Sequence, residues 1–233
     1  MELLSWGDRG WGDELARATL MTIAVATLAF LLGLAFGSLG AAAKLSRFAP
    51  LRAAADTYTT VLRGIPDLLV IYLLFFGGSG MLMFVARMFG HGGYIEINAF
   101  ATGCIAIAIV SGAYSTEAIR GGVLAIPRGE IEAARAFGMS RLLLFRRILA
   151  PQALRYALPA LGNVWQLALK ETALISVTGL VEIMRQSSIA AGSTKKPFTF
   201  YAAAAVLYLL LTAVSHLALH RAETRALRGL RRA

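Results

Sequence analysis

The stretch ATLMTIAVATLAFLLGLAFGSLGAAA, residues 18–43, contains no charged residue and lies between Arg17 and Lys44. Crossing the hydrocarbon core of a membrane, about 30 Å thick, takes roughly 20 apolar residues in a helix. This stretch is longer than that minimum. It therefore predicts a transmembrane helix that crosses the membrane with some tilt.

The composition of the whole chain agrees with this reading. Of its 233 residues, 58% are apolar and only 15% are charged, with a mean hydropathy of +0.66. Soluble domains have about 45–50% apolar and about 25% charged residues. The excess excludes a free cytosolic enzyme, a disordered chain and a disulfide scaffold. We expect an all-α integral membrane protein that forms a single transmembrane domain, residues 1–233.

Charge-free stretches elsewhere in the chain predict further spans at about 58–86, 97–119 and 197–220. A fifth candidate, 154–178, is interrupted by Lys170 and Glu171. One helix over that range would place both charges inside or at the edge of the membrane. Taking it as a span gives five transmembrane helices.

The positive residues predict the orientation, because Lys and Arg concentrate on the cytoplasmic side of a membrane. With the N-terminus outside, most of them fall on inner segments, including the largest loop and the C-terminal tail. The C-terminus is then cytoplasmic. The net charge of +10 is spread over three inner segments, so it favours contact with anionic membrane lipid over a nucleic-acid groove.

The largest inner loop, 121–151, reads GGVLAIPRGEIEAARAFGMSRLLLFRRILAP. Pro127 can open a helix, since its missing N–H would be unpaired at a helix start. Gly138 can adopt the left-handed conformation that ends a helix, and Ser140 can cap the start of another. We therefore expect a short helix, a sharp turn and a second helix that ends at Pro151.

The first of these short helices has an unusual face. Ala133, Ala134 and Ala136 are small, and Phe137 is a large apolar side chain in a loop otherwise rich in Arg. Small side chains allow another protein to approach the backbone closely, and aromatic residues often anchor interfaces. The alternative is an amphipathic helix that packs back on its own bundle.

These residues carry a resemblance to a known family. The segment EAARAFGMSRLLLFRRILAP resembles the EAA loop of permease subunits of ATP-binding-cassette (ABC) importers. The residues that match its spacing are Glu132, Ala133, Ala134, Gly138, Ile148 and Pro151, whereas Ala150 replaces the usual Leu. The similarity extends over most of the chain. It points to the polar amino-acid branch, with permeases for histidine, for lysine, arginine and ornithine, and for opines.

The resemblance implies the type I importer permease fold in a bacterial inner membrane. It implies that the helix 127–137 is a coupling helix docked on a separate ATPase, with the contact made by Glu132, Ala133, Ala134, Arg135, Ala136, Phe137 and Gly138. The implied partners are two ATP-binding subunits, a second related permease or a copy of this chain, and an extracytoplasmic solute-binding protein. ATP and Mg would be held by the ATPase, and no cofactor by this chain, which has no phosphate-binding loop motif.

Substrate contact is expected at the charged interruption of the fifth span. Ionisable residues inside a membrane are costly and therefore candidate functional groups. A cationic amino acid would suit Glu171, and a carboxylate would suit Lys170 or the Thr172 hydroxyl. Alternatively, Lys170 and Glu171 lie in the outer headgroup zone. Two other charge pairs, Arg63 with Asp67 and Glu117 with Arg120, are expected to be structural.

Other function classes fit the sequence less well. A stand-alone secondary amino-acid carrier would be expected to show an internal inverted repeat, and none is visible. A permease for another polar amino acid, such as glutamate or glutamine, remains an alternative. An enzyme would need a catalytic cluster, and none stands out. His216 and His220 have the spacing of a two-histidine metal site, but no further ligand set accompanies them, so we expect no metal.

Overall fold

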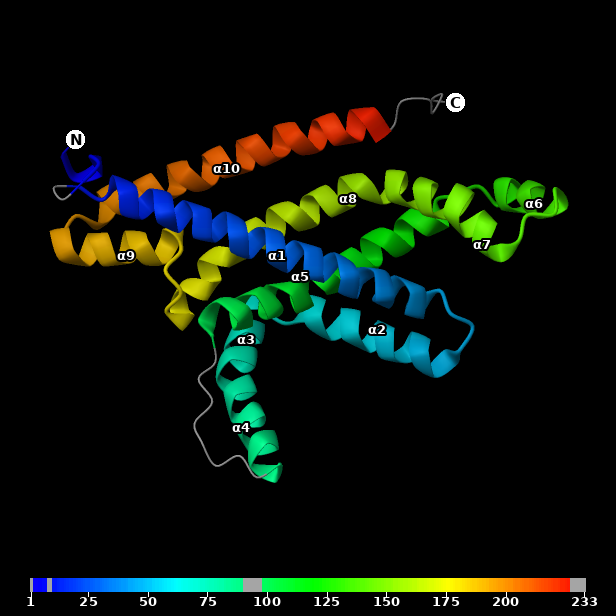
Figure 1. Cartoon of the computed structure of the whole chain (residues 1–233), viewed down its shortest axis with the longest axis horizontal. Coiled ribbons are helices and arrows are strands. Elements are labelled where there is room, and N and C mark those ends of the chain that lie inside the picture. Colours follow the sequence, from blue (N-terminus) through cyan, green and yellow to red (C-terminus); the bar gives the residue numbers. More distant parts are fainter. Residues whose placement is uncertain (1, 8–9, 90–97, 227–233) are drawn as a thin grey trace.

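The computed structural model describes residues 2–7, 10–89 and 98–226. Over this part of the chain all regular structure is helical (Figure 1). After a short 3₁₀ turn, η1 (Glu2–Leu4), the longest helix, α1 (Gly12–Lys44), runs the length of the bundle and lies beside α5 (Ala99–Leu124). Residue 97, the first of one expected span, lies outside the described ranges.

Glycines on α1 allow this close pairing. A Cβ added at Gly33 would lie 2.2 Å from Ser111 Oγ, and one at Gly37 would lie 2.4 Å from Ser115 Cβ. Small residues let membrane helices approach until their backbones are nearly in contact. The two helices therefore form the tightly packed centre of the molecule. A core cluster of Val25, Ala29, Cys104 and Ile107 continues this packing to Ala168 and Ile175.

The expected span 58–86 is not a single helix. Helix α2 (Ala49–Gly64) runs beside α1 and α5, and α3 (Asp67–Tyr72) with the π-helical segment η2 (Leu73–Gly77) leaves it at 110°. The cause is Pro66, which forces the preceding Ile65 into an extended conformation with φ −102° and ψ 141°. Helix α4 (Gly78–Met88) continues away from the bundle (Figure 1).

The region of the expected span 154–178 is helical in two parts. Helix α8 covers Ala150–Glu171, and a 3₁₀ segment, η4, continues it over Thr172–Thr178 to the left-handed Gly179. A helix that the sequence reading missed, α9 (Ile183–Thr194), follows and packs against α10 (Pro197–Ala226).

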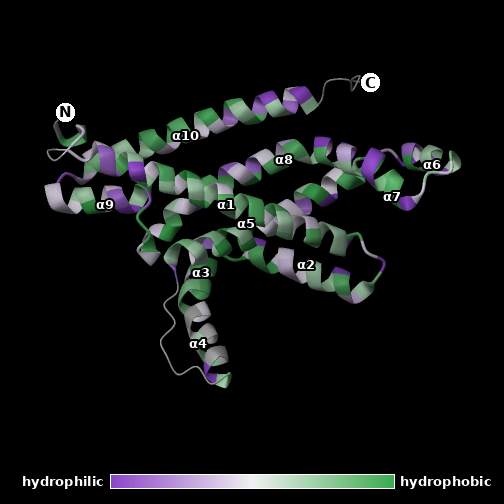
Figure 2. Cartoon of the chain, viewed as in Figure 1, coloured by the Kyte–Doolittle hydropathy of each residue, from purple (hydrophilic) through white to green (hydrophobic). Residues whose placement is uncertain are grey.

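Length and apolar composition identify α1, α5 and α10 as helices able to span a membrane, within the described residues. The bent pair α2 with α3–η2 would make a fourth if counted as one span. Helix α8 is not among the helices that are both long and apolar enough, so the expected number of five spans stays a prediction. In Figure 2, hydrophobic residues dominate the middle of α1 and α5, and hydrophilic ones are frequent near α7 and toward the end of α10.

The loop 121–151 projects from one end of the bundle, opposite the N-terminus (Figure 1). It holds α6 (Arg128–Ala136), α7 (Arg141–Leu144) and the π-helical segment η3 (Phe145–Leu149). The expected end of the second helix at Pro151 is wrong, because η3 leads directly into α8. The wider π turn comes just before the proline, which lies in the first turn of α8, where its missing N–H costs little.

Candidate functional site

The turn between α6 and α7 is fixed by local backbone chemistry. Pro127 precedes the first residue of α6, and Glu130 lies in its first turn, where a negative charge favours a helix start. Gly138 has φ +77°, as the sequence indicated, and its N–H donates to the Arg135 carbonyl at 2.9 Å. The side chain of Ser140 then accepts from the Leu143 N–H at 3.4 Å and caps α7.

This turn leaves most of α6 exposed. Within α6 only Ala134 is buried, and Phe137 is 87% exposed although it is a large aromatic residue. Glu132, Ala133, Arg135, Ala136 and Gly138 are also exposed. The side-chain amide of Gln152 donates to Glu130 and connects α6 to α8. The segment is thus a projecting helix with an apolar tip, held to the bundle at its base.

The three residues expected at the substrate site point to different surroundings. Glu171 is only 4% exposed, and neither of its carboxyl oxygens has a hydrogen-bond partner. Lys170, its neighbour, is exposed. Thr172 is buried: its hydroxyl donates to the Leu169 carbonyl at 2.8 Å and pairs with the Tyr208 hydroxyl at 3.1 Å. The structure therefore does not gather these three side chains at one point.

Residues distant in the sequence surround Glu171 instead. Its charged neighbour is Asp67, the first residue of α3. Tyr114 on α5 lies close enough to interact electrostatically with both carboxylates. The Arg63 guanidinium lies over the Tyr114 ring, 5.3 Å from its centroid. The expected Arg63–Asp67 ion pair is not among those formed by the described residues, because the helix break at Ile65 and Pro66 separates the two.

A polar cleft of about 490 Å³ adjoins this group. Arg63 and Tyr114 line one part of it, and Lys44 and Glu117 line another. Lys44 Nζ lies 2.8 Å from Asp56 and 2.5 Å from Glu117, so one cation joins α1, α2 and α5. The expected pair of Glu117 and Arg120 is confirmed, with 2.8 Å between the nearest oxygen and nitrogen.

Sequence reasoning missed a buried network that begins at Thr172, next to Glu171. Glu182 is fully buried and caps α9, accepting from the Met184 and Arg185 N–H groups at 2.9 and 2.7 Å. The Tyr208 hydroxyl also donates to it at 2.9 Å. Glutamate is not one of the usual N-cap residues, so Gly179, as a possible helix end, was the only local signal that a new helix follows. Thr172 of η4 is hydrogen-bonded to Tyr208 of α10, which is hydrogen-bonded to Glu182 at the start of α9. The network therefore holds η4, α9 and α10 together.

The described ranges hold no group of three or more His, Cys, Asp or Glu side chains suited to a metal ion. The rings of His216 and His220 stack on α10 with 6.4 Å between their centroids. Two features therefore stand out: the projecting α6, and the neighbouring carboxylates of Glu171, which is buried, and Asp67, which is half-buried.

Comparisons with known proteins agree with one another. Residues 29–228 match the family described as "Binding-protein-dependent transport system inner membrane component". The chain is 59% identical over 231 residues to the octopine transport system permease protein OccQ of Rhizobium radiobacter, covering 99% of this chain and 98% of that protein. It is 39% identical over 224 residues to the histidine/lysine/arginine/ornithine transport system permease protein HisQ of Escherichia coli (strain K12), covering 96% and 98%.

A solved structure is similar along most of its length as well. The crystal structure of an amino acid ABC transporter with histidines contains a chain that superposes with a TM-score of 0.79 at 33% identity. The match covers 92% of this chain and 95% of the other. The fold of these helices is therefore shared with a transporter subunit.

Proposed function

Because the chain belongs to the binding-protein-dependent transport system inner membrane component family, we propose that α6 couples it to an ATP-hydrolysing partner and that the carboxylates of Glu171 and Asp67 recognise the substrate. The chain is the permease subunit of an ABC importer for amino acids or opines. It is not itself an enzyme, since ATP hydrolysis in such transporters belongs to a separate subunit. A stand-alone secondary carrier is thereby excluded.

The observation that carries the coupling role is the exposed tip of α6. An aromatic side chain as exposed as Phe137 is suited to anchoring an interface, and the neighbouring alanines let a partner approach the helix backbone. Glu132 to Gly138 would form the contact with the ATPase. The rigid turn at Gly138 would then transmit movement of α6 through α7 and η3 to α8. In the complete importer, ATP and Mg are bound by the ATPase.

The substrate is proposed to carry a cationic side chain, as a basic amino acid or an arginine-derived opine does. The named relatives transport octopine and the amino acids histidine, lysine, arginine and ornithine. Glu171, with its two unpaired oxygens, and Asp67 would attract a guanidinium or ammonium group. Arg63 on the adjoining cleft would suit a carboxylate. Lys170 is exposed, and the Thr172 hydroxyl is already bonded, so within the expected set Glu171 is the favoured contact.

The assembly is proposed to contain two ATP-binding subunits, a second related permease or a copy of this chain, and a solute-binding protein outside a bacterial inner membrane. Five spans would place the N-terminus outside and the C-terminus in the cytoplasm. The support is the distribution of Lys and Arg, together with the position of α6 at the end of the bundle opposite the N-terminus.

Reconstitution of the complete importer in vesicles tests this function. We expect uptake of octopine or arginine to require ATP inside the vesicles and binding protein outside them. We also expect it to be abolished when the ATPase nucleotide site is inactivated. Competition by arginine, histidine, glutamate and octopine identifies the substrate class. Preference for glutamate would overturn the cationic assignment, and uptake without the ATPase would overturn the importer itself.

A further inference from the structure

An apolar groove of about 610 Å³ lies between α1, α5 and α8 and is separate from the polar cleft. Its walls include Leu34 and Leu45 on α1, Val123 on α5, and Phe145 and Leu161 on the η3–α8 side. The one hydroxyl that lines it, on Ser38, donates to the Leu34 carbonyl at 2.8 Å. The groove therefore offers no free hydrogen-bonding group and is suited to a hydrocarbon.

The groove begins at one end of the bundle and stops near its middle. Leu45 and Val123 lie at the ends of α1 and α5 nearest the α6–α7 loop, and Leu34 lies deeper in the bundle. The part of α1 from Leu34 to Leu45 is about 16 Å long at 1.5 Å per residue. This is close to half of the roughly 30 Å thickness of the hydrocarbon core. The groove thus matches one leaflet.

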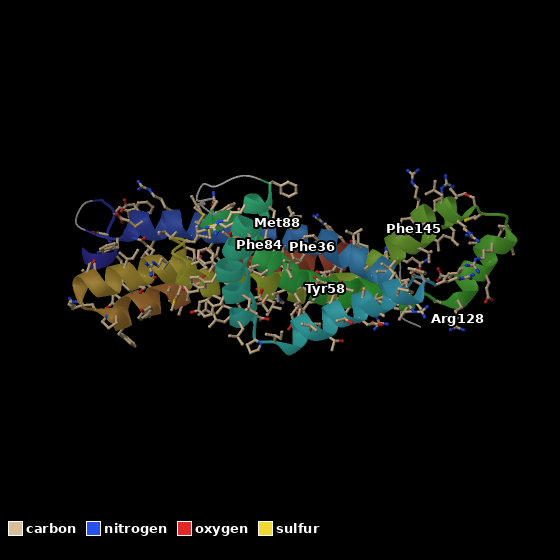
Figure 3. All side chains as sticks on the ribbon, turned by 90° about the horizontal axis from the view of Figure 1, so that it is seen from below. Phe36, Tyr58, Phe84, Met88, Arg128 and Phe145 are labelled. Atoms are coloured by element: carbon tan, nitrogen blue, oxygen red, sulfur yellow. The ribbon has the colours of Figure 1, made fainter. Side chains whose placement is uncertain are left out.

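Unpaired positive charge lies beside the end of the groove nearest the α6–α7 loop. Arg146 precedes the groove-lining Ala150 and Leu154 at intervals of four residues, so it continues their face of the helix. Arg141 stands in the same relation to Phe145. Both arginines are exposed, and neither forms an ion pair with any residue in the described ranges. Figure 3 places Phe145 in the same end region of the bundle as Arg128.

We propose that this groove binds one acyl chain of an anionic phospholipid from the cytoplasmic leaflet, with the phosphate held by Arg141 and Arg146. Basic pockets between membrane helices on the cytoplasmic side suit anionic headgroups. The proposal takes its orientation from the proposed function. A second copy of this chain fits less well, because it would bring its own basic inner loops, in a chain of net charge +10, against these arginines.

Native mass spectrometry of the complete importer, purified from nanodiscs of phosphatidylglycerol and phosphatidylcholine, tests this proposal. We expect retained phosphatidylglycerol, and a loss of roughly tenfold or more in the double variant Arg141→Gln, Arg146→Gln. The matched control neutralises two exposed arginines at the opposite end of the bundle, Arg17→Gln on α1 and Arg185→Gln on α9, and should leave retention unchanged. Equal retention in all three proteins, or equal retention of phosphatidylcholine, would overturn the proposal.

A photo-crosslinking amino acid at Ala42, which lines the groove and is exposed, identifies the occupant directly. An adduct with the mass of a phospholipid supports the proposal. An adduct with a second permease chain refutes it and makes the groove a subunit interface. Uptake measured on the same preparations reports on the importer function separately, so failure of the lipid site leaves that function standing.

Discussion

At the scale of single residues, the turn at Gly138 depends on one backbone angle. Its φ of +77° is strained for any side chain and most of all for a β-branched one. A left-handed residue other than glycine costs about 1–2 kcal/mol. We expect Gly138→Val to distort the turn and to uncouple ATP hydrolysis from uptake, so that hydrolysis continues while uptake falls.

Parallel measurement of ATPase activity and uptake in vesicles checks this expectation. Gly138→Asn is the matched control, because asparagine tolerates the left-handed region, and it should keep the two activities coupled. Normal uptake by the Val variant would show that the turn does not transmit movement.

Glu171 is a second residue whose single substitution should change both thermal stability and uptake. A carboxylate buried without a partner costs stability, so Glu171→Gln should leave the melting temperature unchanged or raise it. The same change would remove the proposed charged contact to the substrate, and a hydrogen bond to a charged group is worth about 1.5–3 kcal/mol. We therefore expect uptake of a cationic substrate to fall by roughly tenfold or more in transport assays.

The comparison variant is Glu182→Gln. This carboxylate is also buried, but it accepts from two backbone N–H groups and from Tyr208, so its loss should lower the melting temperature. If Glu171→Gln lost stability and kept uptake, Glu171 would be a structural residue like Glu182.

At the scale of helices, the pairing of α1 with α5 depends on close approach. A side chain at Gly37 would meet both Ser115 Cβ at 2.4 Å and the Ser115 backbone carbon at 3.0 Å. We expect Gly37→Leu to force the helices apart and to destabilise the protein by at least the roughly 1–3 kcal/mol of an overpacked core. Thermal unfolding in detergent measures this. Gly121→Leu, on the same helix pair but facing open space, should have little effect.

The turns, caps and ion pairs of these helices also differ in how well the sequence predicts them. The turn at Gly138, the cap at Ser140 and the pair of Glu117 with Arg120 depend on residues within a few positions of one another, and all three are confirmed. The break after Ile65 was not predicted, because hydropathy does not register a bend in an apolar stretch, although Pro66 was a signal. Continuation through Pro151 was missed because a π turn leaves no clear sequence pattern.

The surroundings of Glu171 could not be predicted for a different reason. Asp67 and Tyr114 approach it from other helices, and only the packing of α5 against α8 and of α3 against η4 determines that they meet. The sequence identified Glu171 because burying a charge is costly, and that argument needs only the one residue. Which side chains lie next to it depends on the tertiary structure.

At the scale of the whole molecule, the two ends of the bundle should lie on opposite sides of the membrane. The start of α10 lies at the end with the N-terminus, and α6 lies at the other (Figure 1). Leu4 in η1, Phe198 in the first turn of α10 and Phe137 at the end of α6 are all exposed. The chain has one cysteine, Cys104, which is 1% exposed and should react slowly. Single cysteines at the three positions can therefore be labelled against a low background.

We expect Leu4→Cys and Phe198→Cys to react with a membrane-impermeant maleimide in intact cells, and Phe137→Cys to react only after permeabilisation. Labelling at both 4 and 198 requires an even number of crossings between them. If Phe137→Cys reacts only after permeabilisation, α8 with η4 must cross as well, although α8 is less apolar than α1, α5 and α10. Protection of Phe198→Cys in intact cells would reduce the number of spans and place Lys170 and Glu171 outside any crossing helix.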